Sequence, residues 1–435
     1  MSLSFELQRV VSTLFSFLAH LVARVFVRQS GELHAFILPP TGAGSAGDQA
    51  MVQATAQTLS DRGFTRIDVV RYSPEDNWGA AERLFTSSVT WPRKSPFSWV
   101  SFALKVARGS HFLTLGADVL DGKYGYIKPW RMLEVSSLAA RLGLDTRICG
   151  FSLNSSPHPQ MIRAFNRLSK KVVCYQWDPV SAQRFRDLTA RQGVEVADLA
   201  FLLSPENSPF VAEVGEWIDA RRRLGDKVMG LNLNYLPFAA MKLQTESVLR
   251  QITENVGVLL HSEDNLSLVF VPHDSREERN DVWFAGEIYQ RLDGALKPRC
   301  RLIERVPEAS EIKGVASMLD FAITGRMHFL IALMGSGVPG LGVTYQGKFQ
   351  GLYQLFDIKG LGITPNEFLQ QEPFLVSARN LIAHCDDIQS RLSRQLDAVK
   401  KLSMSQLPVT SNPRTGCAKK TVPESAADNI PPVTV

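Results

Sequence analysis

Cysteine is scarce in this sequence of 435 residues, which has five. The five are isolated from one another, they include no CxxC pair, and their number is odd. A disulfide framework and a structural zinc site are therefore not expected, and a reducing compartment is the simpler interpretation. Three of them, Cys149, Cys174 and Cys300, lie in apolar, strand-like segments and are predicted to be core residues.

The sequence also lacks a strong excess of charge of one sign. Its 48 basic and 43 acidic residues give a formal net charge of +5, and dense runs of Lys and Arg are missing. This excludes the concentrated positive field expected of a nucleic-acid-binding protein, while anionic small molecules or a membrane surface remain compatible partners. A hydrophobic content of 45% with 21% charged residues is typical of a globular protein, and the length predicts two domains.

Long apolar runs are absent except near the amino terminus. Between positions 10 and 27 the exceptions to apolar character are Ser12, Thr13, Ser16, His20 and Arg24. Their spacing gives a narrow polar stripe on a helix. A secretory signal would need an uninterrupted apolar core and a cleavage site, and a spanning helix would carry Arg24 inside it. Residues 1–30 are predicted to form an amphipathic helix that lies on a membrane surface or binds a partner, with packing on the protein body and a true anchor as alternatives.

Residues 31–205 are predicted to form a Rossmann-like domain. A strand over 33–40, a Gly-rich turn over 42–49, a helix over 50–63 and a strand over 66–72 form a βαβ unit. Further strands are predicted over 111–120, 146–153, 171–177 and 196–203, and helices over 124–143, 159–169 and 179–193. Strands that alternate with helices predict a mostly parallel sheet covered on both faces.

The same pattern starts again in residues 206–375. Strands are predicted over 227–234, 266–274, 300–306, 320–325 and 339–345, and helices over 240–262, 281–294, 311–319, 326–337 and 348–358. The predicted fold class is α/β, with two Rossmann-like domains facing a cleft, where ligands bind at the carboxyl ends of the strands. A helix over 376–402 is expected to cross back over the first domain, and residues 403–435, rich in Pro, Ser and Thr, to be a disordered tail.

The residues between 320 and 349 predict an anion-binding and catalytic centre. Gly325 makes the turn after a strand, and Arg326 and His328 then occupy the first turn of a helix, where free N–H groups favour an anion. Arg326 adds a planar fork suited to carboxylate or phosphate, and His328 exchanges a proton near neutral pH. Lys348 follows the next strand and is expected at the same rim. The alternative is that Arg326 and Lys348 are solvated and that His328 caps the helix.

This segment resembles the carboxyl-terminal signature of the polysaccharide pyruvyl transferase family, in which an acidic residue and a short strand precede Gly-Arg-x-His, Gly-x-Pro and Tyr-x-x-Lys. The chain has every element, at Asp320, Gly325, Arg326, His328, Gly337, Pro339, Tyr345 and Lys348. The Gly-rich turn resembles the family's amino-terminal Asn-x-Gly-Asp-Glu-Ala turn and keeps Gly47, Asp48 and Ala50, with Ser45 and Gln49 substituted. The resemblance covers residues 34–360.

One position departs from the family pattern. The family's Arg-Asp-x-x-Ser element has Trp177 here in place of Arg, followed by Asp178 and Ser181. If that Arg binds the donor, Arg184 or Arg186 would have to replace it, or the activity would be altered. The alternative is that Trp177 at its strand end serves packing.

The resemblance implies a glycosyltransferase-B-like fold and a cytoplasmic enzyme of polysaccharide biosynthesis, peripheral on the inner face of the plasma membrane if the first helix binds there. It implies transfer of the pyruvyl unit of phosphoenolpyruvate to a saccharide or lipid-linked glycan precursor as a ketal, without a metal or a cofactor. Gly325, Arg326 and Lys348 would bind the donor, and His328 would act as general acid or base. Asp48 would contact acceptor hydroxyls, unless it only caps its turn.

Two other functions fit the same pattern. The first is a nucleotide-sugar-dependent glycosyltransferase of the same architecture. The second is a non-catalytic, glycan-binding family member, which Trp177 and the amphipathic amino terminus make credible.

His273, which also ends a predicted strand, is expected to be a surface residue of a loop.

Overall fold

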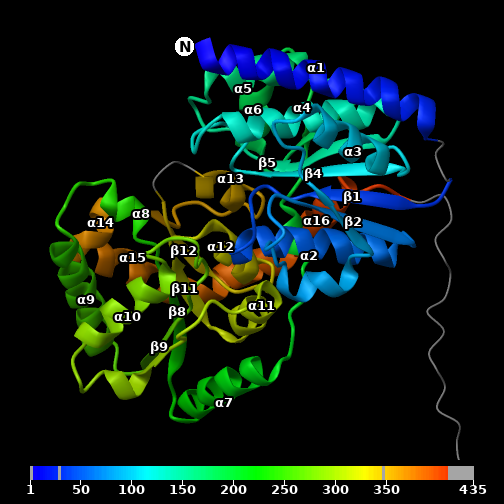
Figure 1. The fold of residues 1–435 in the computed structure, drawn as a ribbon. Coiled ribbons are helices and arrows are strands. Elements are labelled where there is room, and N and C mark those ends of the chain that lie inside the picture. The colour runs from blue at the N-terminus through cyan, green and yellow to red at the C-terminus, as the bar shows by residue number, and fades with distance from the viewer. Residues whose placement is uncertain (1–2, 28–30, 345–347, 410–435) are drawn as a thin grey trace, which may run out of the picture.

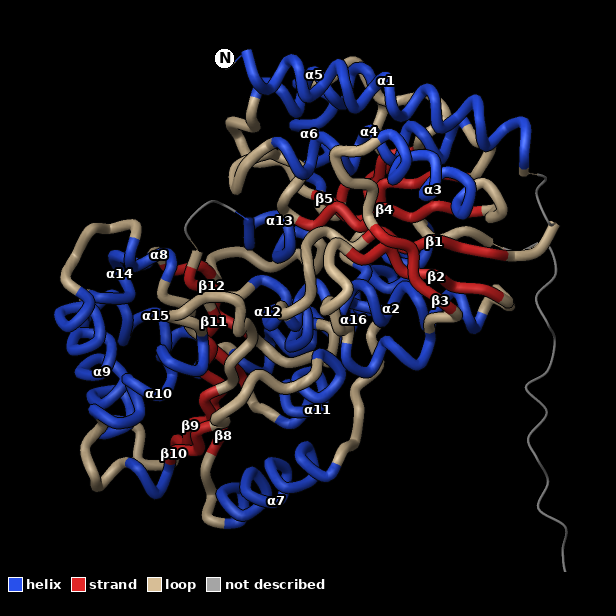
Figure 2. Tube along the Cα trace, in the orientation of Figure 1, coloured by secondary structure: helices blue, strands red, loops and turns tan. Residues whose placement is uncertain are grey.

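The computed structural model describes residues 3–27, 31–344 and 348–409. Its first sheet contains β1 (His34–Leu38), β2 (Arg66–Arg71), β3 (Ser87–Thr90), β4 (His111–Ala117), β5 (Asp145–Phe151), β6 (Val173–Gln176) and β7 (Val194–Glu195). Its second sheet contains β8 (Lys227–Asn232), β9 (Leu266–Phe270), β10 (Cys300–Leu302), β11 (Phe321–Thr324), β12 (Gly340–Val343) and β13 (Gly362–Ile363). Figure 2 shows the two sheets as separate layers of strands.

Both sheets have the strand order of a Rossmann fold. The first runs β3-β2-β1-β4-β5-β6-β7 and the second β10-β9-β8-β11-β12-β13, so each places its first strand next to its fourth. The strand pairs of both sheets are parallel. The prediction of an α/β fold with two Rossmann-like sheets is confirmed. In each sheet the change of direction between the first and fourth strands opens the carboxyl ends to a ligand.

Helices cover the sheets (Figure 1). Those of the first half are α1 (Leu3–Phe26), α2 (Ala46–Asp61), η1 (Gly79–Leu84), α3 (Pro96–Val106), α4 (Ile127–Arg141), α5 (Pro159–Arg167), α6 (Pro179–Leu188) and η2 (Leu199–Leu202). Those of the second half are α7 (Pro209–Arg223), α8 (Leu236–Ala239), α9 (Thr245–Ser262), α10 (Asp281–Arg291), η3 (Lys297–Arg299), α11 (Ala309–Met318), α12 (Met327–Met334), α13 (Lys348–Gln354), α14 (Pro365–Leu369), α15 (Gln371–Ala383) and α16 (Cys385–Ser405).

Several elements differ from the prediction for local reasons. Residues 196–203 were predicted to form a strand, but β7 is two residues long and Asp198 then caps the short helix η2 by accepting from the Ala200 N–H at 2.7 Å. The strand β3 was not predicted because three of its four residues are exposed and polar. The helix α7 was not predicted, although Ser208 caps it and Pro209 opens it.

The carboxyl-terminal region also differs from the prediction. The single helix predicted over 376–402 is two helices, α15 and α16, which meet at His384. The second crosses back to the first domain, where Arg62 donates to the carbonyl oxygens of Leu407 and Pro408 at 2.8 Å. Of the tail predicted to be disordered, residues 403–409 are described, and Ser403, Gln406 and Leu407 are fully buried. Residues 410–435 lie outside the described residues.

The four described cysteines, Cys149, Cys174, Cys300 and Cys385, are buried free thiols. This confirms the core placement predicted for the first three. Cys417 lies outside the described residues.

The amino-terminal helix α1 lies across α3 and α4 on the outside of the first domain (Figure 1). Its small and polar side faces inward: Ser16, Ala19 and Ala23 are fully buried, and Ser16 accepts from Arg141 at 2.5 Å. Its large apolar side faces outward and exposes Leu7, Val10, Leu14, Phe17, Leu18, Leu21, Val25 and Phe26. By length and composition alone, the segment Glu6–Phe26 is long and apolar enough to cross a membrane.

Candidate active site between the two sheets

The predicted centre after β11 is formed by a tight turn that starts α12. The Gly325 N–H donates to the Asn232 carbonyl oxygen at 2.7 Å, and the Arg326 N–H donates to the Thr324 hydroxyl at 2.9 Å. Arg326 is the N-cap of α12, and His328 lies in the first turn of that helix. The turn therefore places both side chains at the carboxyl edge of the second sheet, as the sequence predicts.

Arg326 is already paired with two carboxylates. Its Nη2 lies 2.6 Å from Asp281 Oδ1, its Nε lies 3.1 Å from Asp281 Oδ2, and its Nη1 lies 3.4 Å from Asp274 Oδ2. Burial raises the pKa of Asp281, and the charge of Arg326 opposes this rise. In this structure the fork of Arg326 therefore binds protein carboxylates, and its predicted role in donor binding stays a prediction.

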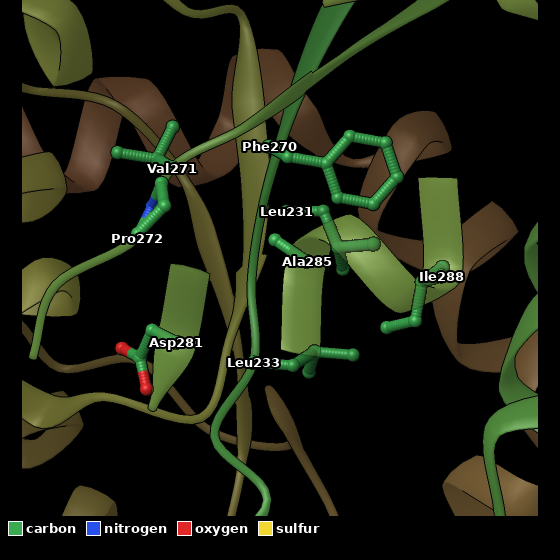
Figure 3. Close-up of a pocket in the computed structure, with 8 residues that line it drawn as sticks. All are labelled: Leu231, Leu233, Phe270, Val271, Pro272, Asp281, Ala285 and Ile288. Atoms are coloured by element: carbon green, nitrogen blue, oxygen red, sulfur yellow. The ribbon is translucent and has the colours of Figure 1, made fainter. Parts of the chain in front are cut away.

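A small cavity adjoins this pair at the carboxyl ends of β8 and β9 (Figure 3). It has a volume of about 10 Å³ and is lined by Asp281 together with the apolar residues Leu231, Leu233, Phe270, Val271, Pro272, Ala285 and Ile288. Such a volume holds about one water molecule. The cavity does not hold a substrate, but its apolar lining explains why Asp281 is poorly solvated.

His328 reaches across to the first domain. Its Nε2 lies 3.5 Å from Asp198 Oδ2, and its ring meets the Trp177 ring edge to face with centroids 6.0 Å apart. Gly47 leaves the space for this ring, because a Cβ there would lie 2.5 Å from His328 Nδ1. Burial alone would lower the pKa of His328, but Asp198, with help from Asp48 and Asp118, raises it above the usual value.

Asp48 faces the same interface from the start of α2. It accepts a short hydrogen bond from Thr41, and Arg276 Nη1 of the second domain lies 3.4 Å from its Oδ2. Burial raises the pKa of Asp48, although Arg276 and Thr41 oppose the rise. The turn before α2 is tied to the loop after β9, since the Ala46 N–H donates to the His273 carbonyl oxygen at 3.1 Å. Asp48 and His328 therefore share one interface.

His273 is buried, so the expectation of a surface residue is wrong. Its side chain is 4% exposed, and burial, followed by the nearby charges of His328 and Arg326, lowers its pKa to about 3. His273 is consequently neutral near pH 7 and is a poor candidate for proton transfer there.

The segment that carries Trp177 meets the predicted Lys348 region. Trp177 is 4% exposed and belongs to the main apolar core, which supports the packing interpretation. Asp178 caps α6 by accepting from the Ser181 N–H at 2.8 Å, and Gly351 of α13 lies directly against it. The helix α13 begins at Lys348, whose side chain lies outside the described residues, as does Tyr345.

The two arginines proposed as substitutes on α6 differ in position. Arg184 is half-buried and donates to the Leu153 carbonyl oxygen at 3.0 Å, near the carboxyl end of β5. Arg186 is exposed and donates to Gln183 of its own helix at 2.8 Å. The contacts of Arg184 therefore bring it toward the sheet edge, whereas those of Arg186 do not.

The sequence did not single out three further residues of this interface: Asp198, Arg276 and Asp281. Asp198 lay inside a predicted strand. A signal was available for Asp281, because Asn280 followed by an acidic residue is a typical helix start. Arg276 lies in a polar loop, and only the fold brings it to Asp48.

Known structures share the fold of this chain over 86% of its length. A putative UDP-N-acetylglucosamine 2-epimerase from Listeria monocytogenes aligns with a TM-score of 0.55 at 10% identity, over 86% of this chain and 94% of that one. The HepE protein of Anabaena, in complex with UDP and glucose, aligns with a TM-score of 0.53 at 11% identity, over 86% and 97%. The UDP-GlcNAc 2-epimerase of Neisseria meningitidis, bound to UDP-GlcNAc, aligns with a TM-score of 0.54 at 11% identity, over 86% and 99%.

These likenesses show the glycosyltransferase-B-like fold alone, because the identities are low. No curated protein matches the sequence of this chain. The model of one protein family matches residues 46–347, which include both the Gly-rich turn at Asp48 and the Gly-Arg-x-His motif at His328. With that match over most of its length, the chain belongs to the polysaccharide pyruvyl transferase family and is a transferase of polysaccharide biosynthesis.

Proposed function

We propose that this transferase moves the pyruvyl unit of phosphoenolpyruvate onto two hydroxyl groups of a saccharide. The observation that carries the proposal is the placement of His328, the histidine of the family's Gly-Arg-x-His motif, against Asp198 at the interface of the two domains. The raised pKa of His328 favours the protonated imidazolium near neutral pH. That form is able to give a proton to the methylene carbon of the donor.

The proposed reaction needs no oxidant and no cofactor. His328 gives its proton to C3 of phosphoenolpyruvate, which becomes a methyl group, and C2 becomes an oxocarbenium-like centre. A first acceptor hydroxyl attacks C2 and loses its proton to the neutral imidazole. The bond between C2 and the phosphate oxygen then breaks, a second hydroxyl attacks C2, and its proton leaves with the phosphate. The products are a cyclic pyruvate ketal and inorganic phosphate, and Asp48 orients the acceptor hydroxyls.

The donor carries a phosphate and a carboxylate, and the proposed cations for them are Arg276, Arg184 and Lys348. Arg276 is 37% exposed and lies between Asp48 and Asp274. Arg326 supports the site by holding Asp281 and Asp274. The cavity beside His328 has a volume of only about 10 Å³, so we expect the facing elements of the two domains to separate when the donor binds.

Ligand-induced stabilisation tests the donor. The three structural neighbours described above share the fold, and two of them are complexes with UDP or a UDP-sugar, so a nucleotide sugar is the competing donor. A ligand at a hundred times its Kd adds about 2.7 kcal/mol to the free energy of unfolding. We expect phosphoenolpyruvate to raise the Tm and UDP-sugars to leave it unchanged, and phosphate release to depend on an added saccharide. Protection by UDP-sugars alone would favour the glycosyltransferase, and binding without turnover would favour a glycan-binding protein.

We also propose that the outward face of α1 holds the enzyme on a membrane surface, where a lipid-linked glycan precursor is the acceptor. Large apolar side chains cover this face, and the small inward face already packs on the domain. A surface helix of a globular protein normally turns its large apolar side chains toward the core and its polar side chains toward water. Arg24, exposed on the same helix, adds attraction to an anionic surface.

Sedimentation with anionic vesicles tests this surface. Because Ala19 and Ala23 are buried against the domain, deleting the helix would expose core, and point changes are cleaner. Leu14→Gln/Phe17→Gln should weaken vesicle binding by about a hundredfold or more, because each side chain contributes about 1.5 to 3 kcal/mol when buried. The control Thr13→Gln, at an exposed polar position of α1 that lies beside α4 and outside the apolar face, should bind as the natural protein does. Equal binding of both variants, or no binding by the natural protein, would refute membrane attachment through α1.

A further inference from the structure

A second, larger cavity lies between α1 and α4, outside the interface of the two domains. Its volume is about 200 Å³, and its walls include Val11 and Phe15 of α1 and Ile127 and Trp130 of α4. Two cationic residues, Lys94 and Arg131, also line it. The cavity therefore combines apolar walls with positive charge. This lining is complementary to a hydrocarbon chain that ends in an anionic group.

A series of ring and cation contacts runs from this cavity toward the proposed active site. Arg131 lies over the Trp91 ring at 5.3 Å, and the Trp91 and Tyr72 rings are 5.0 Å apart. Lys128 Nζ also lies over the Tyr72 ring, 3.5 Å from its centroid. Lys128 interacts electrostatically with Asp48. The path from the cavity to Asp48 is thus lined by aromatic rings and by the cations of one face of α4, since Lys128 and Arg131 are one turn apart.

These cations are open to an anionic ligand. Within the part of the chain that the structure describes, Lys94, Lys128 and Arg131 form no ion pair with a carboxylate. Arg131 donates to the Pro92 carbonyl oxygen through one nitrogen, but its buried Nε has no hydrogen-bond partner. Burial lowers the pKa of Lys128 to about 8, although Asp48 and Asp76 oppose the fall. An anion between these groups would supply the missing partner.

We propose that the cavity between α1 and α4 binds the hydrocarbon chain of a single-chain lipid phosphate, and that Lys94, Lys128 and Arg131 bind its phosphate groups. This inference rests on the proposed function for its biological meaning, because it makes that lipid the carrier of the saccharide acceptor. The saccharide would then extend past Tyr72 toward Asp48. The cavity adjoins the outward apolar face of α1, because Leu7 belongs to both, so the chain would enter directly from the membrane surface.

Binding of farnesyl diphosphate to the full chain tests the site without any need for turnover. Calorimetry or the change in tryptophan fluorescence reports the binding, because Trp130 lines the cavity. Each methylene group that leaves water gives roughly a fourfold gain in affinity, so inorganic diphosphate should bind at least about a hundredfold more weakly. Farnesol should also bind more weakly, because it lacks the charged group. Lys128→Gln should weaken the binding of farnesyl diphosphate by about tenfold and leave the binding of farnesol unchanged.

Two adjacent valines provide a matched pair of variants. Val11 lines the cavity, whereas Val10 is 54% exposed on the outer face. Val11→Trp fills the cavity and should weaken the binding of farnesyl diphosphate by tenfold or more. Val10→Trp should bind farnesyl diphosphate as the natural protein does. Equal affinities of the two variants would overturn the proposal. Displacement of farnesyl diphosphate by phosphatidylglycerol vesicles at similar concentration would also overturn it, since the cavity would then take ordinary membrane lipid.

The outcome is separable from that of the proposed function. If phosphoenolpyruvate is not used but Val11→Trp selectively loses farnesyl diphosphate, the lipid phosphate site stands and the pyruvyl transfer fails. If pyruvyl transfer to a saccharide without a lipid is found and farnesyl diphosphate does not bind, the transfer stands and the lipid phosphate site fails.

Discussion

Arg326→Ala should lower the free energy of unfolding by about 3 to 5 kcal/mol, which is the cost of leaving a buried charge without its partner. Asp281 is 1% exposed and Asp274 is 5% exposed, and both face the guanidinium. Chemical denaturation at pH 7 measures the loss. Exposed pairs contribute far less, so Arg391→Ala, which removes the exposed partner of Asp387, should cost no more than about 0.5 kcal/mol and is the control.

The pH dependence of this variant gives a second measurement. Burial raises the pKa of Asp281 even with Arg326 present, and removing the cation raises it further. A carboxyl whose pKa is higher in the folded state binds more protons when folded, so stability rises as the pH falls. The deficit of Arg326→Ala should therefore shrink in acid, and Arg326→Ala/Asp281→Asn should recover part of it at pH 7. Arg326→Ala with natural stability at every pH would show that the pair contributes nothing.

A loss of stability in Arg326→Ala would change how the phosphoenolpyruvate affinity of the same variant is interpreted. The sequence placed Arg326 at a helix start, where an anion is favoured, and from this alone it is a binding residue. The structure adds Asp281 and Asp274, which come from a different helix and a different loop. No spacing in the sequence indicates that these carboxylates occupy the fork. A loss of phosphoenolpyruvate affinity in Arg326→Ala is informative only beside the stability of the same variant.

Local patterns predicted the fold well because each signal lies within one element. The alternation of strands and helices, and the turn at Gly325, depend on neighbouring residues. The contacts of His328 are of another kind, because Asp198, Gly47 and Trp177 come from three different segments of the first domain. Asp198 was missed because the mostly apolar run over residues 196–203 resembles a strand. The short helix η2 that forms there instead directs the Asp198 carboxylate toward His328.

The amino-terminal helix shows the limit of periodicity. The polar stripe was visible in the sequence, but periodicity does not say which side faces the protein. Ser16 of that stripe and the neighbouring Ala19 and Ala23 allow α1 to approach α3 and α4 closely, and Arg141 satisfies the buried hydroxyl of Ser16. Close packing and one hydrogen bond therefore decide the orientation, and the larger apolar side is left outside.

His328→Gln should lower turnover by about a hundredfold or more and leave donor affinity within a few fold, because the proposed role of His328 is proton transfer. Gln keeps a polar side chain of similar length beside Gly47 and Asp198, so the fold should persist. Calorimetry with phosphoenolpyruvate and the rate of phosphate release measure the two effects separately. A variant with near-natural turnover would remove His328 from the mechanism, and a loss of binding alone would make it a donor ligand.

The pH profile distinguishes proton transfer from a structural role for the same histidine. Asp198 raises the pKa of His328, so the protonated form persists to higher pH, and activity that needs it should fall as the pH rises through this raised pKa. Asp198→Asn removes the carboxylate but keeps an oxygen able to accept from the Ala200 N–H. In a plot of kcat against pH, the fall on the alkaline side should then move to lower pH in this variant, and the acid side should be unchanged. If His328 served only to pack against Trp177, Asp198→Asn would leave the position of that limb where it is in the natural enzyme.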